Sequence, residues 1–291
     1  MGVNNMNVLS LFNGMSFGRM ALDTMGVTAN KYYSSEIDKY ANQAAQALFP
    51  DTIQLGDVTQ WREWDIDWAS INLVTGGFPC QAWSMAGKQL GDKDERGMLF
   101  WTMLDIMMHI KYHNPKADFL IENVKMKKEF EQYITTHTEN ALGKVHKILI
   151  NSALVSAQNR NRYYWTSFAV EQPRDRNKRL ESILLSTGDS RYFISEKQLS
   201  RLDISNMREG GGRICFSRPG ESVEKSECLM ARDYKGISGK QFFTVVIQDG
   251  SLRKLTVREC FRLQTVPEHH IDTLLSAGIS NTQLYKMCGN G

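Results

Sequence analysis

Cys80 lies in the loop formed by residues 76–84, directly after the apolar run 71–75. The run has the composition of a buried parallel strand, and its glycines mark the point where the strand ends. Pro79 fixes its own φ and biases Phe78 toward an extended conformation, so Cys80 has little conformational freedom. A thiol held at the carboxyl end of a strand is a candidate nucleophile. The alternative is a small buried hydrophobic residue, which Pro-Cys alone would favour.

Glycines and acidic residues are predicted at the ends of the first three strands. Residues 7–12 form a predicted strand that runs into a turn with Gly14 and Gly18, where the backbone can approach a ligand. Glu36 lies at the end of the second predicted strand, about 20 residues after the glycine turn. A carboxylate at this place can accept hydrogen bonds from ribose hydroxyls. Asp57 ends the third strand. Each placement alone fits a solvated loop, but together they predict a nucleoside pocket without the full pyrophosphate-binding fingerprint.

Glu122 comes directly after another apolar strand, residues 118–121. If this carboxyl group is partly buried, its protonated form is favoured, which suits a proton donor. The alternative is an ion pair with Lys125, Lys127 or Lys128, which follow closely in the sequence.

Two arginines, Arg160 and Arg162, are two residues apart. In a strand, side chains at this spacing project from the same face, so we expect both guanidinium groups on one surface. Together they can contact a phosphate and a carbonyl oxygen. An ordinary basic pair on the surface is the alternative.

The elements that would position these side chains alternate between strand and helix as far as about residue 168. Residues 171–249 are polar and rich in loops, which predicts a second, irregular domain. Regular structure returns with a helix at residues 255–263, for which Thr256 and Glu259 form a capping box. The predicted fold class is α/β, with a doubly wound, mostly parallel mixed sheet and a second, smaller domain.

Composition sets limits on the compartment and the partners. The chain has 291 residues, 42% of them hydrophobic and 23% charged, as is ordinary for a soluble globular protein. Its five scattered cysteines lack the spacing of a zinc site or a disulfide framework, which favours a reducing compartment and no metal. Without a signal-peptide pattern or an apolar run of membrane-spanning length, we expect a cytoplasmic protein that does not enter a membrane. The net charge of +3 permits a nucleic-acid partner.

Taken in order, these stretches resemble the motifs of the cytosine-5 DNA methyltransferase family, and the resemblance spans nearly the whole chain. The matching segments are residues 12–18, 36–41 and 56–58 for the cofactor, 77–84 for the nucleophile, 122–124 for the acid, 158–162 for Gln-x-Arg-x-Arg, 253–264 for the return to the catalytic domain, and 289–291 for the last motif. Any one of these motifs is weak, but the set in this order is specific.

The resemblance implies a mechanism in which a cytosine is flipped out of duplex DNA. Cys80 would attack carbon 6 of the cytosine, and Glu122 would protonate or hydrogen-bond ring nitrogen 3. Arg162, helped by Arg160, would hold the carbonyl oxygen and stabilise developing charge. Carbon 5 would then receive the methyl group, lose its proton and release Cys80.

The methyl donor implied by the resemblance is S-adenosyl-L-methionine. The residues expected to bind it are Phe12, Asn13, Gly14, Ser16, Gly18, Glu36, Ile37, Asp57, Val58, Pro79, Leu99 and Asn290. The implied fold is the Rossmann-like methyltransferase fold. The implied domains are a catalytic, cofactor-binding domain at 1–168, a target-recognition domain at 169–251, and a return segment at 252–291 that packs on the catalytic domain.

The implied function is sequence-specific methylation of duplex DNA by a monomer, with a cognate restriction endonuclease as a further partner. One alternative is a tRNA cytosine-5 methyltransferase, a branch that usually carries Cys-Phe-Thr in its recognition region. The chain has Cys-Phe only at Cys260-Phe261, outside that region. The other alternative is a truncated, weak or inactive DNA-binding homologue, because family members usually continue into a helix beyond the motif at which this chain ends, Gly291.

Overall fold

The computed structural model describes residues 6–79, 95–200, 225–235 and 245–291. Cys80 and much of the expected recognition region lie outside these residues. The chain divides into two compact units, one formed by Met1–Ile150 and Asn161–Gln172, and the other by Asn151–Arg160 and Pro173–Gly291. The chain thus leaves the first unit for residues 151–160 and returns to it before the second unit continues.

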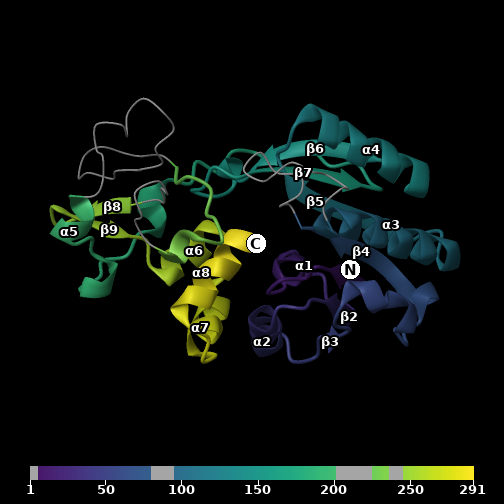
Figure 1. Ribbon diagram of the computed structural model, residues 1–291, viewed down its shortest axis with the longest axis horizontal. Coiled ribbons are helices and arrows are strands. Elements are labelled where there is room, and N and C mark those ends of the chain that lie inside the picture. Colours follow the sequence, from purple (N-terminus) through teal and green to yellow (C-terminus); the bar gives the residue numbers. More distant parts are fainter. Residues whose placement is uncertain (1–5, 80–94, 201–224, 236–244) are drawn as a thin grey trace. The chain divides into compact units, whose positions relative to one another are not determined.

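The first unit contains a seven-stranded sheet in the order β3-β2-β1-β4-β5-β7-β6 (Figure 1). Its strands are β1 (Met6–Leu11), β2 (Ala29–Ser35), β3 (Ile53–Gln54), β4 (Ile71–Gly76), β5 (Asp118–Val124), β6 (His146–Asn151) and β7 (Asn161–Thr166). The pairs β1–β2, β1–β4, β2–β3 and β4–β5 are parallel, whereas β5–β7 is antiparallel. The predicted mostly parallel mixed sheet is confirmed.

Helices connect the parallel strands of this unit. They are α1 (Phe17–Thr24), α2 (Lys39–Leu48), α3 (Glu95–His113) and α4 (Lys128–Leu142), together with the short 3-10 helices η1 (Val58–Glu63) and η2 (Trp68–Ser70). Figure 1 shows α1 and α2 on one side of the sheet and α3 on the other, where α3 contacts α4, η1 and η2. This is the doubly wound arrangement that the alternation of strands and helices predicts.

The main core of the first unit lies between the sheet and α3. Side chains of the strands, such as Val74 and Phe119, pack with Phe100, Met103 and Met107 of α3, and each is almost completely buried. Removing this apolar surface from water fixes the central strands in place. Because β1, β2, β4 and β5 are mutually parallel, their carboxyl ends meet at one edge, and the strand order changes direction between β1 and β4.

The second unit contains a two-stranded antiparallel sheet of β8 (Val245–Gln248) and β9 (Ser251–Lys254). Asp249 and Gly250 connect them with φ values of +50° and +75°, and positive φ at both positions is typical of a tight hairpin turn. The helices of this unit are α5 (Glu196–Leu199), α6 (Val257–Leu263), α7 (Glu268–Ser276) and α8 (Asn281–Asn290), and its short 3-10 helices include η6 (Leu180–Ile183), η7 (Ser190–Tyr192) and η9 (Asp233–Lys235).

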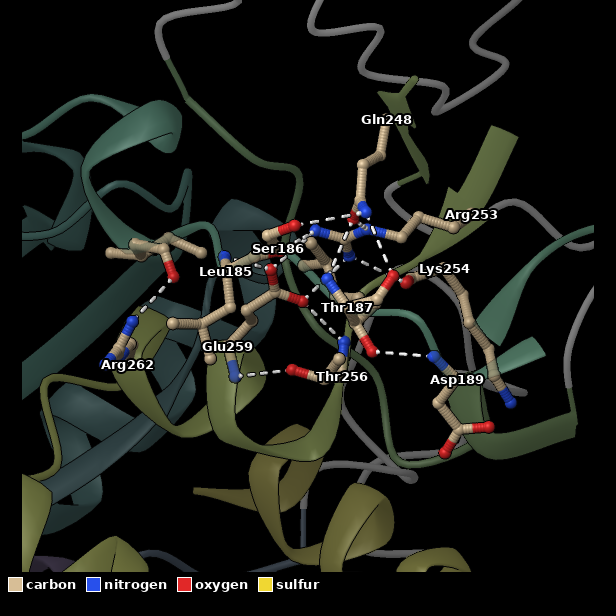
Figure 2. Close-up of polar contacts among 12 residues, drawn as sticks. Leu185, Ser186, Thr187, Asp189, Gln248, Arg253, Lys254, Thr256, Glu259 and Arg262 are labelled. Atoms are coloured by element: carbon tan, nitrogen blue, oxygen red, sulfur yellow. Dashed lines mark hydrogen bonds and ion pairs between the residues drawn. The ribbon is translucent and has the colours of Figure 1, made fainter. Parts of the chain in front are cut away.

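A buried ion pair joins the hairpin to α6. Arg253 donates from Nη1 and Nη2 to the two carboxylate oxygens of Glu259, at 2.9 and 2.8 Å (Figure 2). Glu259 also accepts from the backbone N–H groups of Thr256 and Leu185, so the capping box predicted for this helix is confirmed. Both charged side chains are almost completely buried. The loop at Leu185, the β8–β9 hairpin and α6 are therefore joined by one polar cluster.

None of the helices in the described ranges is both long enough and apolar enough to cross a membrane.

Candidate active site

The loop after β1 has an unusual backbone. Phe12, Gly14 and Ser16 all have positive φ values, of 55°, 57° and 73°. Asn13 holds this shape, because its Nδ2 donates to Ser16 Oγ at 2.8 Å and its Oδ1 accepts from Tyr32 Oη at 3.1 Å. Burial raises the pKa of Tyr32 to about 12, so its hydroxyl remains a donor. The side chains of Asn13 and Ser16 are both buried.

Glu36 ties this loop to the end of β2. Its Oε2 accepts from the backbone N–H of Gly14 at 2.8 Å, and its Oε1 accepts from the N–H groups of Ile37 and Asp38, each at 2.8 Å. Three backbone donors thus fix one carboxylate at the sheet edge. Beside it, the apolar side chain of Ile37 is 76% exposed.

The third strand is shorter than the sequence pattern predicts, because β3 stops at Gln54 and does not reach Asp57. Asp57 caps η1, accepting from the backbone N–H of Thr59 at 2.8 Å and from its hydroxyl at 2.9 Å. Val58 is buried. Asp57 therefore caps η1 in addition to following β3 at the carboxyl edge of the sheet.

These residues fit a nucleoside cofactor. A Cβ built on Gly14 would meet no atom within 4 Å, so the loop borders open space, although its φ disfavours any other residue. The exposed Ile37 offers an apolar surface next to the fixed carboxylate of Glu36. A ribose hydroxyl can donate to such a carboxylate, and an adenine ring can pack on such an apolar surface. The two groups together therefore suit an adenosyl group.

The remaining expected cofactor residues are less closely grouped. Gly18 lies in α1, where a Cβ would be 3.5 Å from Tyr32 Oη, an ordinary contact. Leu99 packs on the main core, and Pro79 is partly buried at the end of a described range. Asn290 is exposed in α8 of the second unit, so its approach to the cofactor stays a prediction.

Glu122 and Arg162 form an ion pair, with Arg162 Nε 2.8 Å from Glu122 Oε1. In the antiparallel pairing of β5 and β7, Arg162 stands opposite Val124. The two side chains therefore meet diagonally across the strands. The side chain of Arg162 is 11% exposed and that of Glu122 is 34% exposed, so the carboxylate faces outward from this pair. Within the described residues the partner of Glu122 is Arg162, rather than a following lysine.

The first residues of the predicted nucleophile loop lie against this acid. A Cβ on Gly77 would be 3.1 Å from Glu122 Oε2, so only glycine leaves the carboxylate uncrowded. Asn123 Nδ2 donates to the carbonyl oxygen of Phe78 at 3.1 Å. The ring of Phe78 packs on Phe100 with centroids 5.1 Å apart. The chain that leads to Cys80 is thereby fixed beside Glu122 as far as Phe78.

Arg160 differs from the expectation. The prediction that it shares a strand face with Arg162 is wrong, because β7 begins at Asn161. Its guanidinium group instead donates to main-chain oxygens of Leu229 and Gly291 and to Cys228 Sγ. Arg160 is 5% exposed and belongs to the second unit, whereas Arg162 belongs to the first.

Two further residues were missed by sequence reasoning. Asn123 follows Glu122 in a strand, so the alternation of side chains was a usable signal that it faces the other way, toward Phe78. Gln158 is completely buried and bonds the N–H of Leu229 and the carbonyl oxygen of Leu263. Nothing in the local sequence indicates the main-chain partners of Gln158.

Comparison with known proteins agrees with this geometry. The profile of the family described as C-5 cytosine-specific DNA methylase matches residues 6–291. The type II methyltransferase M1.ScrFI of Lactococcus lactis subsp. cremoris is 34% identical, over 97% of this chain and 74% of its own. M.NlaX of Neisseria lactamica is 31% identical, over 97% and 91%. The crystal structure of a Spodoptera frugiperda DNMT2 mutant superposes with a TM-score of 0.72, covering 99% of this chain and 96% of that one, at 19% identity.

The family match covers almost the whole chain, and the structural match confirms the Rossmann-like methyltransferase fold. The enzymatic activity is the transfer of a methyl group from S-adenosyl-L-methionine to carbon 5 of cytosine in DNA. The chain belongs to the C-5 cytosine-specific DNA methylase family.

Proposed function

We propose that Cys80, Glu122 and Arg162 perform methylation at a cytosine flipped out of duplex DNA. The observation that supports this most directly is the Glu122–Arg162 ion pair, with Glu122 Oε2 adjoining Gly77 of the nucleophile loop. An acid, a guanidinium group and the approach to a thiol thus meet at the carboxyl ends of β4 and β5. This is the arrangement that addition to a ring and protonation of that ring require.

In the first half of the reaction, the Cys80 thiolate forms a bond to carbon 6 of cytosine. The electron pair of the 5,6 double bond moves through carbon 4 to ring nitrogen 3, which receives a proton from Glu122. The resulting enamine makes carbon 5 a nucleophile. Because Arg162 Nε already engages Glu122, the same guanidinium group can hold the neighbouring carbonyl oxygen and stabilise developing charge.

S-adenosyl-L-methionine, when bound, supplies a methyl group on a sulfonium sulfur, the electrophile for carbon 5. In the second half of the reaction, after the sulfur has left as the neutral thioether of the demethylated cofactor, carbon 5 loses its proton to a water molecule. The electron pair re-forms the 5,6 double bond and expels Cys80 as a thiolate, while ring nitrogen 3 returns its proton to Glu122. The base is thereby restored to its aromatic form with the methyl group in place.

The cofactor is proposed to lie along the carboxyl edge of the sheet. Glu36 would accept from the ribose, while Ile37 and Val58 would contact the adenine and Asp57 would meet its polar edge. The remaining proposed contacts are Phe12, Asn13, Gly14, Ser16 and Gly18 of the first loop, together with Pro79, Leu99 and Asn290. The three backbone donors on Glu36 support its assignment, since they hold the carboxylate in one orientation before a ligand arrives.

Arg160 has a different proposed role from the one its spacing suggests. Its buried guanidinium group joins the segment around Leu229 to the C-terminal end of α8, so it would act through the fold of the second unit. Arg160 is thus proposed as a positioning residue, with Arg162 making the contact to the base.

We also propose that the enzyme acts as a cytoplasmic monomer on a specific DNA sequence, which a cognate restriction endonuclease would share. The relatives that are type II methyltransferases support the part of this proposal that concerns a specific DNA sequence and a cognate endonuclease. Light scattering that gives the mass of one 33.2 kDa chain would support the monomer, and twice that mass would contradict it.

The proposed chemistry predicts that the proton on carbon 5 leaves only after Cys80 has attacked. Duplex DNA labelled with tritium at carbon 5 of cytosine should release its label to water with wild-type enzyme and cofactor. The Cys80→Ala variant should release none. tRNA labelled in the same way provides the comparison between nucleic acids.

Release from DNA alone would support the proposal. Release from tRNA without release from DNA would move the activity to RNA. Equal release by wild type and Cys80→Ala would exclude the covalent mechanism, and no release by a wild-type protein that binds the cofactor would favour the inactive homologue.

A further inference from the structure

An open pocket of about 150 Å³ lies within the second unit, and none of its lining residues is assigned to catalysis or to the cofactor. Its lining is contributed by η7, η9, β9 and α8, so segments far apart in the sequence build it. The lining residues are Arg191, Tyr192, Tyr234, Lys254, Asn281, Thr282 and Tyr285. None of these seven described residues carries a carboxylate, whereas two are cationic. The pocket is therefore suited to an anion.

Lys254 is the central cation of this pocket. Its neighbour Arg253 turns toward Glu259, while Lys254 extends away from that cluster (Figure 2), as alternation along β9 requires. The ammonium group lies over the rings of Tyr192 and Tyr285, 5.7 and 5.6 Å from their centroids. It has no carboxylate partner within the described ranges, and burial lowers its pKa from the usual value. The ammonium group is thus partly desolvated, and the carboxylate that attracts it, Asp189, is already hydrogen-bonded to Arg191.

The other groups around the pocket are mainly hydrogen-bond donors. Ser280 caps α8 without a side-chain hydrogen bond, so the N–H groups of Asn281 and Thr282 lack acceptors within the helix. The hydroxyl of Tyr192 makes no hydrogen bond among the described residues. Lys286, which is not part of the lining, places its ammonium group 5.2 Å from the ring centroid of the lining residue Tyr234. Donors on several sides of one small space are typical of phosphate recognition.

Arg191 contributes less net charge than its type suggests. Its guanidinium group donates to both carboxylate oxygens of Asp189, at 2.6 to 3.0 Å, so most of its charge is balanced at the rim. Among the residues that line the pocket, the uncompensated charge is consequently that of Lys254. This makes Lys254 the residue whose removal should matter most.

We propose that this pocket binds a backbone phosphate of duplex DNA. The inference rests on duplex DNA being the substrate, a polymer that carries one phosphate charge per nucleotide. The volume supports a phosphate group over a whole nucleotide, because pockets for larger ligands usually exceed about 300 Å³. The contact would be independent of base sequence and would add affinity from the second unit.

The test is the salt dependence of DNA binding. Fluorescence anisotropy with an unmethylated 30-base-pair duplex, in a series of potassium chloride concentrations, gives the slope of log K against log salt. Lys254→Gln should reduce the magnitude of this slope by about 1, the amount expected for one lost phosphate contact. Lys254→Arg, which keeps the charge, should retain the wild-type slope. Arg174→Gln removes an exposed charge of the same unit outside the pocket and should leave the slope unchanged.

An unchanged slope in Lys254→Gln would overturn the proposal, as would an equal decrease in Arg174→Gln. Calorimetry with inorganic phosphate tests whether the pocket binds a free anion instead of a DNA phosphate. Saturable phosphate binding that Lys254→Gln abolishes, combined with an unchanged DNA slope, would assign the pocket to a free anion and contradict the DNA contact. Methyl transfer by the wild-type preparation is measured in parallel, because its absence would refute the proposed function rather than the phosphate pocket.

Discussion

Glu122 has neighbours on both sides of its carboxylate, and these define what it can do. Arg162 Nε binds one oxygen at 2.8 Å, and the other oxygen faces Gly77. Asn123, the next residue, faces the opposite way and holds the carbonyl oxygen of Phe78. Two consecutive residues of β5 therefore have different contacts: Glu122, the proposed acid, pairs with Arg162, and Asn123 holds the segment that leads to the proposed nucleophile.

Replacing Glu122 with Gln should reduce methyl transfer by about 10²- to 10⁴-fold, the usual contribution of a general acid. The amide can still accept from Arg162 but cannot supply an acidic proton to ring nitrogen 3. Initial rates with saturating DNA and cofactor would measure the decrease. Glu129→Gln, an exposed change on α4, is the matched control and should keep the wild-type rate. A Glu122→Gln enzyme as active as this control would remove Glu122 from the mechanism.

At the scale of elements, hydrogen bonds join neighbouring loops and strand ends at the carboxyl edge of the parallel strands. Glu36 at the end of β2 binds the N–H of Gly14 in the loop after β1. Asn123 on β5 binds the loop after β4. Each strand end is therefore positioned by a neighbouring strand, and the site depends on the order of the strands in the sheet.

Glu36→Gln should weaken binding of S-adenosyl-L-methionine by about 10- to 100-fold, the range expected for losing a charged hydrogen bond together with the order it imposes on the loop. Calorimetric titration of the cofactor would measure this change. Asp23→Asn, at an exposed position on α1, should bind as tightly as the wild type. Equal affinities in the two variants would place the ribose contact elsewhere.

The strand ends could be predicted because they carry local signals. Apolar runs followed by glycine or an acidic residue indicated the β1, β2, β4 and β5 positions, and the Thr256–Glu259 capping box indicated α6. The Glu122–Arg162 pair could not be derived, since it depends on the antiparallel register of β7, a strand about 40 residues further along the chain. The position of Arg160 was mistaken because two of its acceptors are main-chain oxygens, which leave no pattern in the side chains.

The buried pair Arg253–Glu259 is an element-scale contact of the second unit. It joins β9, the N-terminus of α6 and the loop at Leu185, whose carbonyl oxygen accepts from Arg253 at 2.7 Å. A buried pair is costly to break, because removal of one partner leaves the other charge desolvated.

Glu259→Gln should therefore destabilise the second unit by about 3–5 kcal/mol, seen as a lower melting transition in calorimetry. The double variant Arg253→Met with Glu259→Gln should recover part of this loss, because no unpaired charge remains. Glu268→Gln, which removes an exposed carboxylate paired with the half-buried Arg258 and Arg262, should change the transition far less. Similar effects of Glu259→Gln and Glu268→Gln would contradict a desolvated pair.

At the scale of the whole molecule, the Gln-x-Arg-x-Arg motif is divided between the two units. Gln158 and Arg160 are bonded within the second unit, and Arg162 is bonded to Glu122 in the first. Five consecutive residues therefore contact both the proposed acid in the first unit and the interior of the second unit.

The family match extends from residue 6 to residue 291, so the whole of this divided architecture belongs to the same enzyme family. The boundaries expected for the three domains, 1–168, 169–251 and 252–291, remain predictions. The compact units follow different limits, with residues 151–160 and 173–291 together in one unit.

The central claim is that a thiol at Cys80 acts together with Glu122 and Arg162 to methylate cytosine in DNA. Transfer of labelled methyl groups from S-adenosyl-L-methionine to mixed-sequence duplex DNA tests it most directly, with cofactor binding measured on the same protein. The wild type should label cytosine in DNA, and Cys80→Ala should transfer nothing while it binds the cofactor with wild-type affinity. Transfer by Cys80→Ala at the wild-type rate would contradict the account.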